Sequence, residues 1–278
     1  MSVYAGEDAD HFRQCLDGIR RQTVMPDEFV LVKDGALTRE LDEVISDFRG
    51  AGAGCGLRAV SLPENVTQGP ARAEGVKEAR YGWVAIMDSD DVCRPDRFEK
   101  QLQMIGANPA LGLIGGQIAE FVSDPGRTAS VRAVPVSHCD IVKFIKRRNP
   151  FNQMTVMFRR DLAIEAGNYG YFPGFEDYDL WARMVRRGAV CANHPDVLVD
   201  ARIGAGMHGR RKGLRYVKYE WRMQERLLQC GLINKFDFCV NVGLRAPVRL
   251  LPVKGVEAFY SRYIRRHPRA AGDGRPYG

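Results

Sequence analysis

The amino-acid sequence predicts an α/β fold with a mostly parallel central sheet flanked by helices. Up to residue 110, apolar residues recur alternately at helical spacing and in short continuous runs, which is the pattern of successive βαβ units. The 278 residues are 45% hydrophobic, which is enough for the core of one large domain or two small ones. This composition excludes disordered and collagen-like proteins.

The first half of the chain supplies most of this pattern. Apolar residues at helical spacing predict helices over residues 12–19, 37–48 and 70–80. Short apolar runs predict buried strands over residues 29–32, 57–62 and 83–87. The glycine-rich stretch 50–56 has no G-x-G-x-x-G spacing, so we interpret it as a linker and not as a phosphate-binding loop. Ligands of parallel sheets bind beyond the carboxyl ends of the strands, where Asp34 and Asp88 fall.

The pattern loosens after residue 110. Ser137 and Asp140 have the spacing of a capping box that opens a helix. The remaining predicted elements are strands over 111–122 and 154–158 and helices over 177–187 and 213–229. We expect a main domain over residues 1–210, followed by a basic, helical and amphipathic C-terminal extension over residues 211–278.

Charge is unevenly distributed along the chain. Residues 202–278 contain 17 Lys and Arg against 5 Asp and Glu, which gives this part a net charge of +12. Because the net charge of the whole chain is +7, residues 1–201 carry −5. A basic extension on an acidic body indicates an anionic partner such as lipid headgroups, nucleic acid or diphosphates. Apolar residues interleaved with arginine after residue 232 favour a segment that lies on an anionic membrane surface. The alternative is a helix packed on the body with a solvated basic face. Nucleic acid is disfavoured, because no DNA- or RNA-binding motif accompanies the charge.

Other features indicate the compartment. No run reaches the roughly 18 apolar residues of a membrane-spanning helix. Acidic residues and His11 follow Met1 with no apolar stretch, so we expect no signal peptide. The 7 cysteines are odd in number and form no C-x-x-C pair, which fits reduced thiols. The expected location is therefore cytoplasmic, with peripheral contact to the inner face of the plasma membrane.

The strongest chemical signal is the sequence Asp88-Ser89-Asp90-Asp91 after an apolar run. Three carboxylates within four residues repel one another unless a cation neutralises them. Oxygen ligands at this density suit Mg²⁺ or Mn²⁺, which often bind through one or two carboxylates and substrate phosphates. The alternative is a helix N-terminus with acidic residues in its first turn, and we expect Asp91 to take part in such a cap.

With its surroundings, this segment resembles the D-x-D signature of family-2 glycosyltransferases of the bacterial exopolysaccharide and O-antigen type. The resemblance covers roughly residues 1–210 and rests on several motifs in one order. They are Met1-Ser2-Val3-Tyr4, Gln22-Thr23 with Pro26-Asp27-Glu28, Leu62-Pro63-Glu64-Asn65, Gly69-Pro70-Ala71-Arg72, Asn149 to Val156, and Phe175-Glu176-Asp177-Tyr178-Asp179-Leu180-Trp181. It implies the GT-A fold, which is Rossmann-like.

The resemblance implies a donor site for a nucleotide diphosphate sugar. Asp90 would ligate Mn²⁺ or Mg²⁺, Asp88 would contact the ribose or the bridging ion, and His208 would complete the metal shell. The residues implied for the nucleotide sugar are Tyr4, Glu7, Asp34, Arg72, Asp88, Arg210 and Arg211. Two alternatives stay open, namely that Asp34-Gly35 is only a turn and that His208 is an exposed residue without a ligand.

The resemblance also implies an acceptor site. An attacking hydroxyl must lose a proton, so a carboxylate opposite the metal is needed as general base. Asp177 would take this role, Glu176 would orient it or the acceptor, and Asn152 and Trp181 would bind the acceptor. The alternative is again an acidic helix N-terminus. One displacement with one base implies inversion at the anomeric carbon.

The sequence departs from the family pattern at three points. Few residues precede Tyr4, so we expect a short first strand. Ala5 replaces an asparagine that is common after this tyrosine, and Ala73-Glu74 replaces the asparagine that usually follows Arg72.

The expected function is metal-dependent, inverting transfer of a sugar, UDP-linked by preference, to a hydroxyl of a lipid-linked saccharide in surface polysaccharide biosynthesis. One rival is a nucleotidyltransferase, which would release pyrophosphate and normally begins with a Gly-rich, Arg-bearing loop. The other rival is a catalytically degenerate module that only binds nucleotide sugars.

Overall fold

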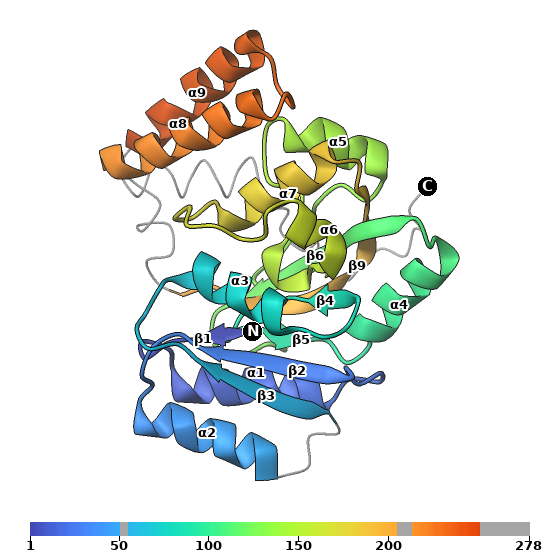
Figure 1. The fold of residues 1–278 in the computed structure, drawn as a ribbon, viewed down its shortest axis with the longest axis vertical. Coiled ribbons are helices and arrows are strands. Elements are labelled where there is room, and N and C mark those ends of the chain that lie inside the picture. Colours follow the sequence, from blue (N-terminus) through green and yellow to red (C-terminus); the bar gives the residue numbers. More distant parts are fainter. Residues whose placement is uncertain (51–54, 205–212, 251–278) are drawn as a thin grey trace.

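The computed structural model describes residues 1–50, 55–204 and 213–250, and it confirms the predicted α/β class (Figure 1). The helices are α1 (Ala9–Arg20), α2 (Arg39–Gly50), α3 (Gln68–Glu78), α4 (Arg97–Ala107), α5 (His138–Ile145), α6 (Arg160–Glu165), α7 (Glu176–Arg186), α8 (Gly213–Gln229) and α9 (Lys235–Leu250). The strands are β1 (Ser2–Val3), β2 (Glu28–Lys33), β3 (Gly56–Ser61), β4 (Trp83–Ala85), β5 (Val92–Cys93), β6 (Leu111–Phe121), β7 (Ser130–Arg132), β8 (Met157–Arg159) and β9 (Val190–Arg202). A 3₁₀ turn, Gln153–Thr155, precedes β8 and shortens the strand predicted there.

The N-terminal sheet is parallel, as predicted, with strand order β1-β2-β3. Successive side chains of a strand point to opposite faces, so β2 packs on both sides. Phe29 and Leu31 join the core formed with α1 and α2, where the rings of Phe29 and Phe48 meet edge to face at 5.6 Å. Val32 faces the other way and packs against Gly75 of α3. The sheet is thereby held between two helices on one face and α3 on the other.

β1 has only two residues and pairs with the last part of β2, at Val32 and Lys33. Beside the rest of β2, a mostly apolar cavity of about 200 Å³ separates it from β4. Phe29 and Val30 line this cavity on one side, and Val84 and Ile86 line it on the other.

The second sheet is mixed, with strand order β4-β8-β6-β9-β5 and β7 at the side of β6. Its longest pairing is the parallel one between β6 and β9. The strand predicted over 83–87 belongs here and not in the parallel sheet, because β4 pairs antiparallel with β8. It also ends at Ala85, after which the chain turns into the acidic segment.

α8 and α9 form a helical hairpin that lies at the end of the molecule opposite α2 (Figure 1). Its inner face joins the main core through Tyr216, Met223 and Leu227, and Tyr216 stacks against Phe175 at 5.4 Å. The part of the predicted amphipathic extension up to residue 250 is therefore helical and packed on the body, whereas residues 251–278 lie outside the described residues. Within the described helices, none is long and apolar enough to span a bilayer.

Candidate active site

The acidic segment Asp88–Asp91 connects β4 to β5 and lies near the carboxyl ends of β1 and β2. Asp88 forms an ion pair with Arg72 of α3. Asp91 is buried and accepts a hydrogen bond from the backbone N–H of Arg202 at 2.7 Å. Among the described residues, no arginine or lysine forms an ion pair with the carboxylate of Asp90. Within the described parts of the chain, the Asp90 carboxylate is thus the one of the three that bonds to no other element.

Two of the three carboxylates, Asp90 and Asp91, have a raised pKa. Burial, and then the charges of Asp88 and Glu7, raise the pKa of Asp90 to about 6, while Arg202 acts in the opposite direction. Burial, followed by repulsion from Asp90 and Asp88, also raises the pKa of Asp91. A divalent cation would relieve this repulsion, and a set of carboxylate oxygens suits Mg²⁺ or Mn²⁺.

No group of three metal-ligating side chains occurs in the described parts of the chain. A site that supplies one or two carboxylates and takes its other ligands from substrate phosphates and water fits this finding. His208, which was expected to complete the metal shell, and Arg210 and Arg211, which were expected to bind phosphate, lie outside the described residues.

The prediction that Asp91 caps the following helix is wrong. β5 intervenes, and α4 begins only at Arg97, with Asp96 in the N-cap position. Asp91 instead fixes the end of β9 through the N–H of Arg202. The competing explanation of the acidic cluster as a helix cap therefore does not apply.

The residues expected around the nucleotide come together at the ends of β1 and β2. Asp34 is buried, and its carboxylate accepts the backbone N–H of Val66 at 2.7 Å. Asp34 follows β2 and holds the loop before α3 in place. Gly35, at φ +84°, forms a turn directly after it, as the alternative interpretation of Asp34-Gly35 predicts. Glu7 accepts a hydrogen bond from Ser89 of the acidic segment. Tyr4 is 44% exposed, so its ring is accessible.

The acceptor-side carboxylates open α7, within the predicted helix. Asp177 accepts a hydrogen bond from the side-chain amide of Asn149 at 2.7 Å and another from the backbone N–H of Tyr178 at 2.7 Å. The bond from Tyr178 is a contact within the first turn of α7, which the alternative of an acidic helix N-terminus predicts. The bond from Asn149 comes from another segment, and that alternative does not predict it. Oε2 of Glu176 is buried and has no hydrogen-bond partner among the described residues. Burial and the charge of Asp177 raise the pKa of Glu176, and Arg72 partly offsets the effect.

Arg72 connects the two carboxylate groups. Burial alone would lower its pKa, but attraction to Asp88 and then to Tyr169, Glu176 and Asp177 raises it. α3 approaches the segment before α7 so closely that a Cβ on Gly69 would lie 2.4 Å from the carbonyl oxygen of Gly170. Asp88 therefore pairs with a buried guanidinium that also feels the charges of Glu176 and Asp177.

Two residues expected to bind the acceptor are fully buried. Asn152 donates to the carbonyl oxygen of Gly116 at 2.8 Å, and Trp181 packs among Phe151, Phe158 and Tyr169. In this conformation an acceptor reaches neither side chain.

Sequence reasoning missed Asn149 and Arg202 as site residues. Asn149 belongs to the quoted segment 149–156 but carries no chemical signal of its own, and its role arises from the approach of α7. Arg202 ends β9, a strand that the sequence pattern did not reveal because Pro195 interrupts it. The Arg-rich stretch that begins at Arg202 was the available signal.

The fold and the paired carboxylate groups define the class as a GT-A glycosyltransferase. Residues 2–167 match the family model "Glycosyl transferase family 2". The chain belongs to glycosyltransferase family 2 and is a glycosyltransferase, as the sequence motifs predicted.

Curated relatives match nearly end to end. An uncharacterized glycosyltransferase of Haemophilus influenzae is 39% identical over 266 residues, which are 96% of this chain and 98% of the relative. The amylovoran biosynthesis glycosyltransferase AmsE of Erwinia amylovora is 36% identical, over 94% of this chain and 97% of its own. The UDP-Gal:alpha-D-GlcNAc-diphosphoundecaprenol beta-1,3-galactosyltransferase of Escherichia coli is 32% identical, over 96% and 95%.

Solved structures support the fold. The mannosyltransferase PcManGT of Pyrobaculum calidifontis, in complex with GDP-Man and Mn²⁺, matches with a TM-score of 0.61 and 18% identity, covering 94% of this chain and 74% of its own. Residues 1–349 of TarS from S. aureus, in complex with UDP-GlcNAc, match with a TM-score of 0.60 and 16% identity, covering 85% and 68%.

Proposed function

We propose that this glycosyltransferase moves a sugar from a UDP-linked donor to a hydroxyl of a lipid-linked saccharide, with a divalent metal ion and with inversion, in the biosynthesis of a surface polysaccharide. The observation that carries the proposal is that α3, whose Arg72 pairs with Asp88, packs against the start of α7, where a Cβ on Gly69 would lie 3.2 Å from Cβ of Glu176. This arrangement supplies the two requirements of the reaction, stabilisation of a leaving diphosphate and removal of a proton from the acceptor. The names of the E. amylovora and E. coli relatives support the polysaccharide context, and the latter supports the UDP donor and the lipid-linked acceptor.

On the donor side, Asp90 and Asp88 would hold Mn²⁺ or Mg²⁺, which would supply positive charge to the departing diphosphate. The ion pair with Arg72 orients the Asp88 carboxylate, and Glu7 accepts a hydrogen bond from Ser89 of the same segment. Tyr4 and Asp34 lie at the strand ends that would receive the nucleoside.

On the acceptor side, Asp177 takes up the proton of the attacking hydroxyl. Asn149 donates to one oxygen of Asp177 and so orients the carboxylate. Glu176 lies beside it and is only partly buried, and its Oε2 has no hydrogen-bond partner among the described residues, which suits a contact to the acceptor sugar. One base and one displacement give inversion at the anomeric carbon.

A transfer assay tests this function. The purified protein is incubated with a panel of UDP-sugars, Mn²⁺ and a GlcNAc-diphospho-lipid acceptor, and UDP release and product anomer are measured. We expect Asp90→Asn and Asp177→Asn each to lower kcat by about 100-fold or more, in line with the loss of a charge-stabilising or general-base group. Removal of metal with EDTA should abolish turnover, and added Mn²⁺ should restore it.

Asp161→Asn, which removes an exposed carboxylate paired with Arg159, is the control and should leave kcat unchanged. In a parallel reaction with UTP and a sugar 1-phosphate in place of the UDP-sugar, release of pyrophosphate would indicate a nucleotidyltransferase. Full activity in both site variants would refute the assignment of the carboxylates.

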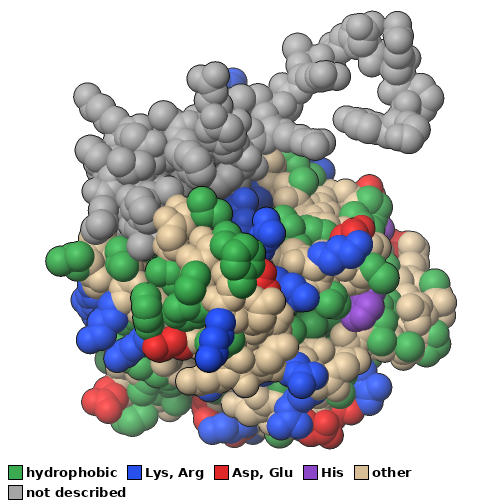
Figure 2. Space-filling model, turned by 90° about the horizontal axis from the view of Figure 1, so that it is seen from above, with side chains coloured by type: hydrophobic (Ala, Val, Ile, Leu, Met, Phe, Trp, Pro, Cys, Tyr) green, Lys and Arg blue, Asp and Glu red, His purple; other side chains and the backbone are tan. Residues whose placement is uncertain are grey.

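We also propose that the hairpin of α8 and α9 touches an anionic membrane. Its outward side chains include Leu214, Trp221, Phe236 and Leu244, which are 77%, 45%, 75% and 68% exposed. Hydrophobic and basic side chains lie interspersed on this end of the molecule (Figure 2). On α8, the side chains of Arg215, Lys218 and Arg222 are exposed. Apolar anchors among cations suit the interface of a membrane with anionic lipids.

Vesicle co-sedimentation tests the membrane contact. Trp221→Ser with Phe236→Ser should reduce binding to vesicles containing anionic lipid. Val122→Ser removes a side chain of similar exposure, 62%, outside the hairpin, and should bind as the wild type does. Equal binding of all three proteins would contradict the proposal.

A further inference from the structure

Arg202, the last residue of β9, makes several separate contacts to the surroundings of the acidic segment. Its backbone N–H donates to the carboxylate of Asp91 at 2.7 Å, and its Nε donates to the backbone carbonyl of Asp90 at 3.1 Å. Its Nη2 donates to the side-chain oxygen of Gln14, on α1, at 2.7 Å. The guanidinium also lies over the ring of Phe121, 4.6 Å from its centre.

We propose that Arg202 is a positioning residue that sets the backbone of the acidic segment, so that Asp90 faces the metal and the diphosphate. The inference rests on the function proposed above and adds a residue to it. Arg202 would act through Asp90 and Asp91 and would not touch the substrate.

The need for such a residue follows from electrostatics. Asp88, Asp90 and Asp91 repel one another, so the segment relaxes outward unless contacts from other elements hold it. Arg72 restrains its beginning through the carboxylate of Asp88. Arg202 restrains its end, and its guanidinium does so through a backbone carbonyl, which leaves the carboxylate of Asp90 available.

The geometry of Arg202 is itself constrained from three sides. Pairing of β9 with β6 places Arg202 opposite Phe121, whose ring supports the flat guanidinium. The planar fork of arginine then directs one N–H to Asp90 and another to Gln14, a fixed arrangement that a lysine ammonium does not reproduce. The acidic segment is thus tied to α1 and to the second sheet at once.

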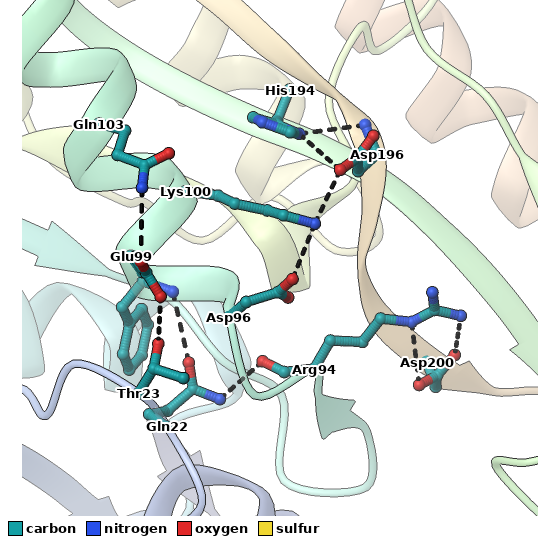
Figure 3. A network of polar contacts seen from close by, with 11 residues as sticks. Gln22, Thr23, Arg94, Asp96, Glu99, Lys100, Gln103, His194, Asp196 and Asp200 are labelled. Atoms are coloured by element: carbon teal, nitrogen blue, oxygen red, sulfur yellow. Dashed lines mark hydrogen bonds and ion pairs between the residues drawn. The ribbon is translucent and has the colours of Figure 1, made fainter.

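A second arginine contact to the same strand provides a matched control. Arg94 pairs with Asp200 of β9, at 3.0 Å between Nη2 and Oδ1, two residues before Arg202 (Figure 3). This contact joins β9 to the residue after β5, but it involves no atom of the segment 88–91. Its loss measures what any arginine contact at this end of β9 contributes to stability.

The test compares Arg202→Met, Arg202→Lys and Arg94→Met with the wild type. Binding of Mn²⁺ with UDP is measured by calorimetry, the Tm is measured by circular dichroism, and kcat and KM are measured at saturating Mn²⁺. We expect Arg202→Met to weaken Mn²⁺-dependent UDP binding by about 10- to 100-fold, the usual effect of removing a group that orients a metal ligand. Arg202→Lys should recover part of it, and Arg94→Met should bind UDP and Mn²⁺ as the wild type does.

Wild-type affinity for Mn²⁺ and UDP in Arg202→Met would overturn the inference, whatever its Tm. Equal weakening in Arg94→Met would also overturn it, because the effect would then be one of general stability. If Arg202→Met does not fold, the affinity of Arg202→Lys for Mn²⁺ and UDP is used in its place, and wild-type affinity in that variant would overturn the inference. If the wild type binds no UDP in the presence of Mn²⁺, both the proposed function and this inference are wrong. That outcome differs from the two above, in which the wild type binds and only the role of Arg202 is refuted.

Discussion

At the scale of single residues, Glu176 is a carboxyl group in an environment that disfavours its charge. Burial and the neighbouring charge of Asp177 raise its pKa above the ordinary value. A carboxyl group with a raised pKa in the folded state costs stability once it ionises, and it costs nothing at a pH where both states are protonated. Stability should therefore fall as the pH rises from the unfolded pKa, 4.5, through the folded pKa.

Glu176→Gln tests this sign. The amide has nearly the same shape and carries no charge, so we expect the variant to have a higher Tm than the wild type at pH 8. The difference should shrink toward zero at pH 4.5. Thermal melts at several pH values measure it, and a difference that is independent of pH would contradict the cause given for the pKa shift.

Asn149 provides a prediction about orientation. Asn149→Ala removes a hydrogen bond to the Asp177 carboxylate, of the kind that contributes about 1.5–3 kcal/mol when one partner is charged. We expect kcat to fall by about 10-fold or more, with little change in the KM of the donor, because the donor site is untouched. Steady-state kinetics measure both constants.

Asn108→Ala, at the end of α4, is the control for Asn149→Ala and should behave as the wild type. An unchanged kcat in Asn149→Ala would show that Asp177 needs no external orientation.

The carboxylates of the site could be predicted from the sequence, and their partners could not. Asp88, Asp90 and Asp91 are conspicuous because neighbouring like charges are costly, and this is visible in a linear sequence. Asn149 and Arg202 reach the site only through chain crossings of 28 and 111 residues or more, which no local pattern encodes. Trp181 is the opposite case. A local sequence motif suggested that it binds the acceptor, but its side chain is fully buried in the core.

At the scale of elements, the contact between α3 and the segment before α7 decides whether the two halves of the site meet. A Cβ on Gly69 would lie 2.4 Å from the carbonyl oxygen of Gly170 and 3.2 Å from Cβ of Glu176. We expect Gly69→Ala to separate the elements and to lower kcat/KM by up to about 100-fold, because displacements near 1 Å have this effect on catalysis.

Gly106→Ala is the matched control for Gly69→Ala. Gly106 also lies in a helix, but no atom lies within 4 Å of its added Cβ. It should keep full activity and gain about 0.5–1 kcal/mol in stability, because alanine favours the helix. Equal activities of the two variants would contradict the role assigned to Gly69.

At this scale, strand pairing could not be predicted from the sequence. Apolar runs predicted the position of β4 to within two residues, but not its antiparallel pairing with β8, which comes from a segment more than 70 residues later. Runs of apolar residues look alike in parallel and mixed sheets, because both environments bury the strand on two faces.

At the scale of the whole molecule, a buried ion pair joins the two helices of the hairpin. Glu220 of α8 is 2% exposed and pairs with Arg245 of α9, which is 21% exposed. Asn241 of α9 then links the hairpin to the body through the carbonyl oxygen of Lys146, at 2.9 Å. The hairpin should therefore unfold together with the body.

Arg245→Met removes the arginine partner of the buried Glu220 side chain. Removal of one partner of a buried pair costs about 3–5 kcal/mol, and we expect about 3 here because Arg245 is partly exposed. A domain of this size loses about 2–4 °C in Tm for each kcal/mol, so a calorimetric scan should show a drop of roughly 6–12 °C in a single transition.

The double variant Glu220→Gln, Arg245→Met removes the carboxylate charge together with the arginine and should recover most of that loss. A double variant as unstable as the single one would contradict the charge argument. A separate early transition in either variant would show that the hairpin folds independently of the body.

The sequence predicts the α/β class, the helices that carry the site and the carboxylates proposed for the reaction. Hydrophobic periodicity and charge density are local properties, so they can be recognised in the linear sequence. The tertiary structure alone decided which groups face one another: Arg72 between the two carboxylate groups, Arg202 on the acidic segment and Trp181 in the core. These depend on how distant segments pack, because burial and ion pairing are set by neighbours in space.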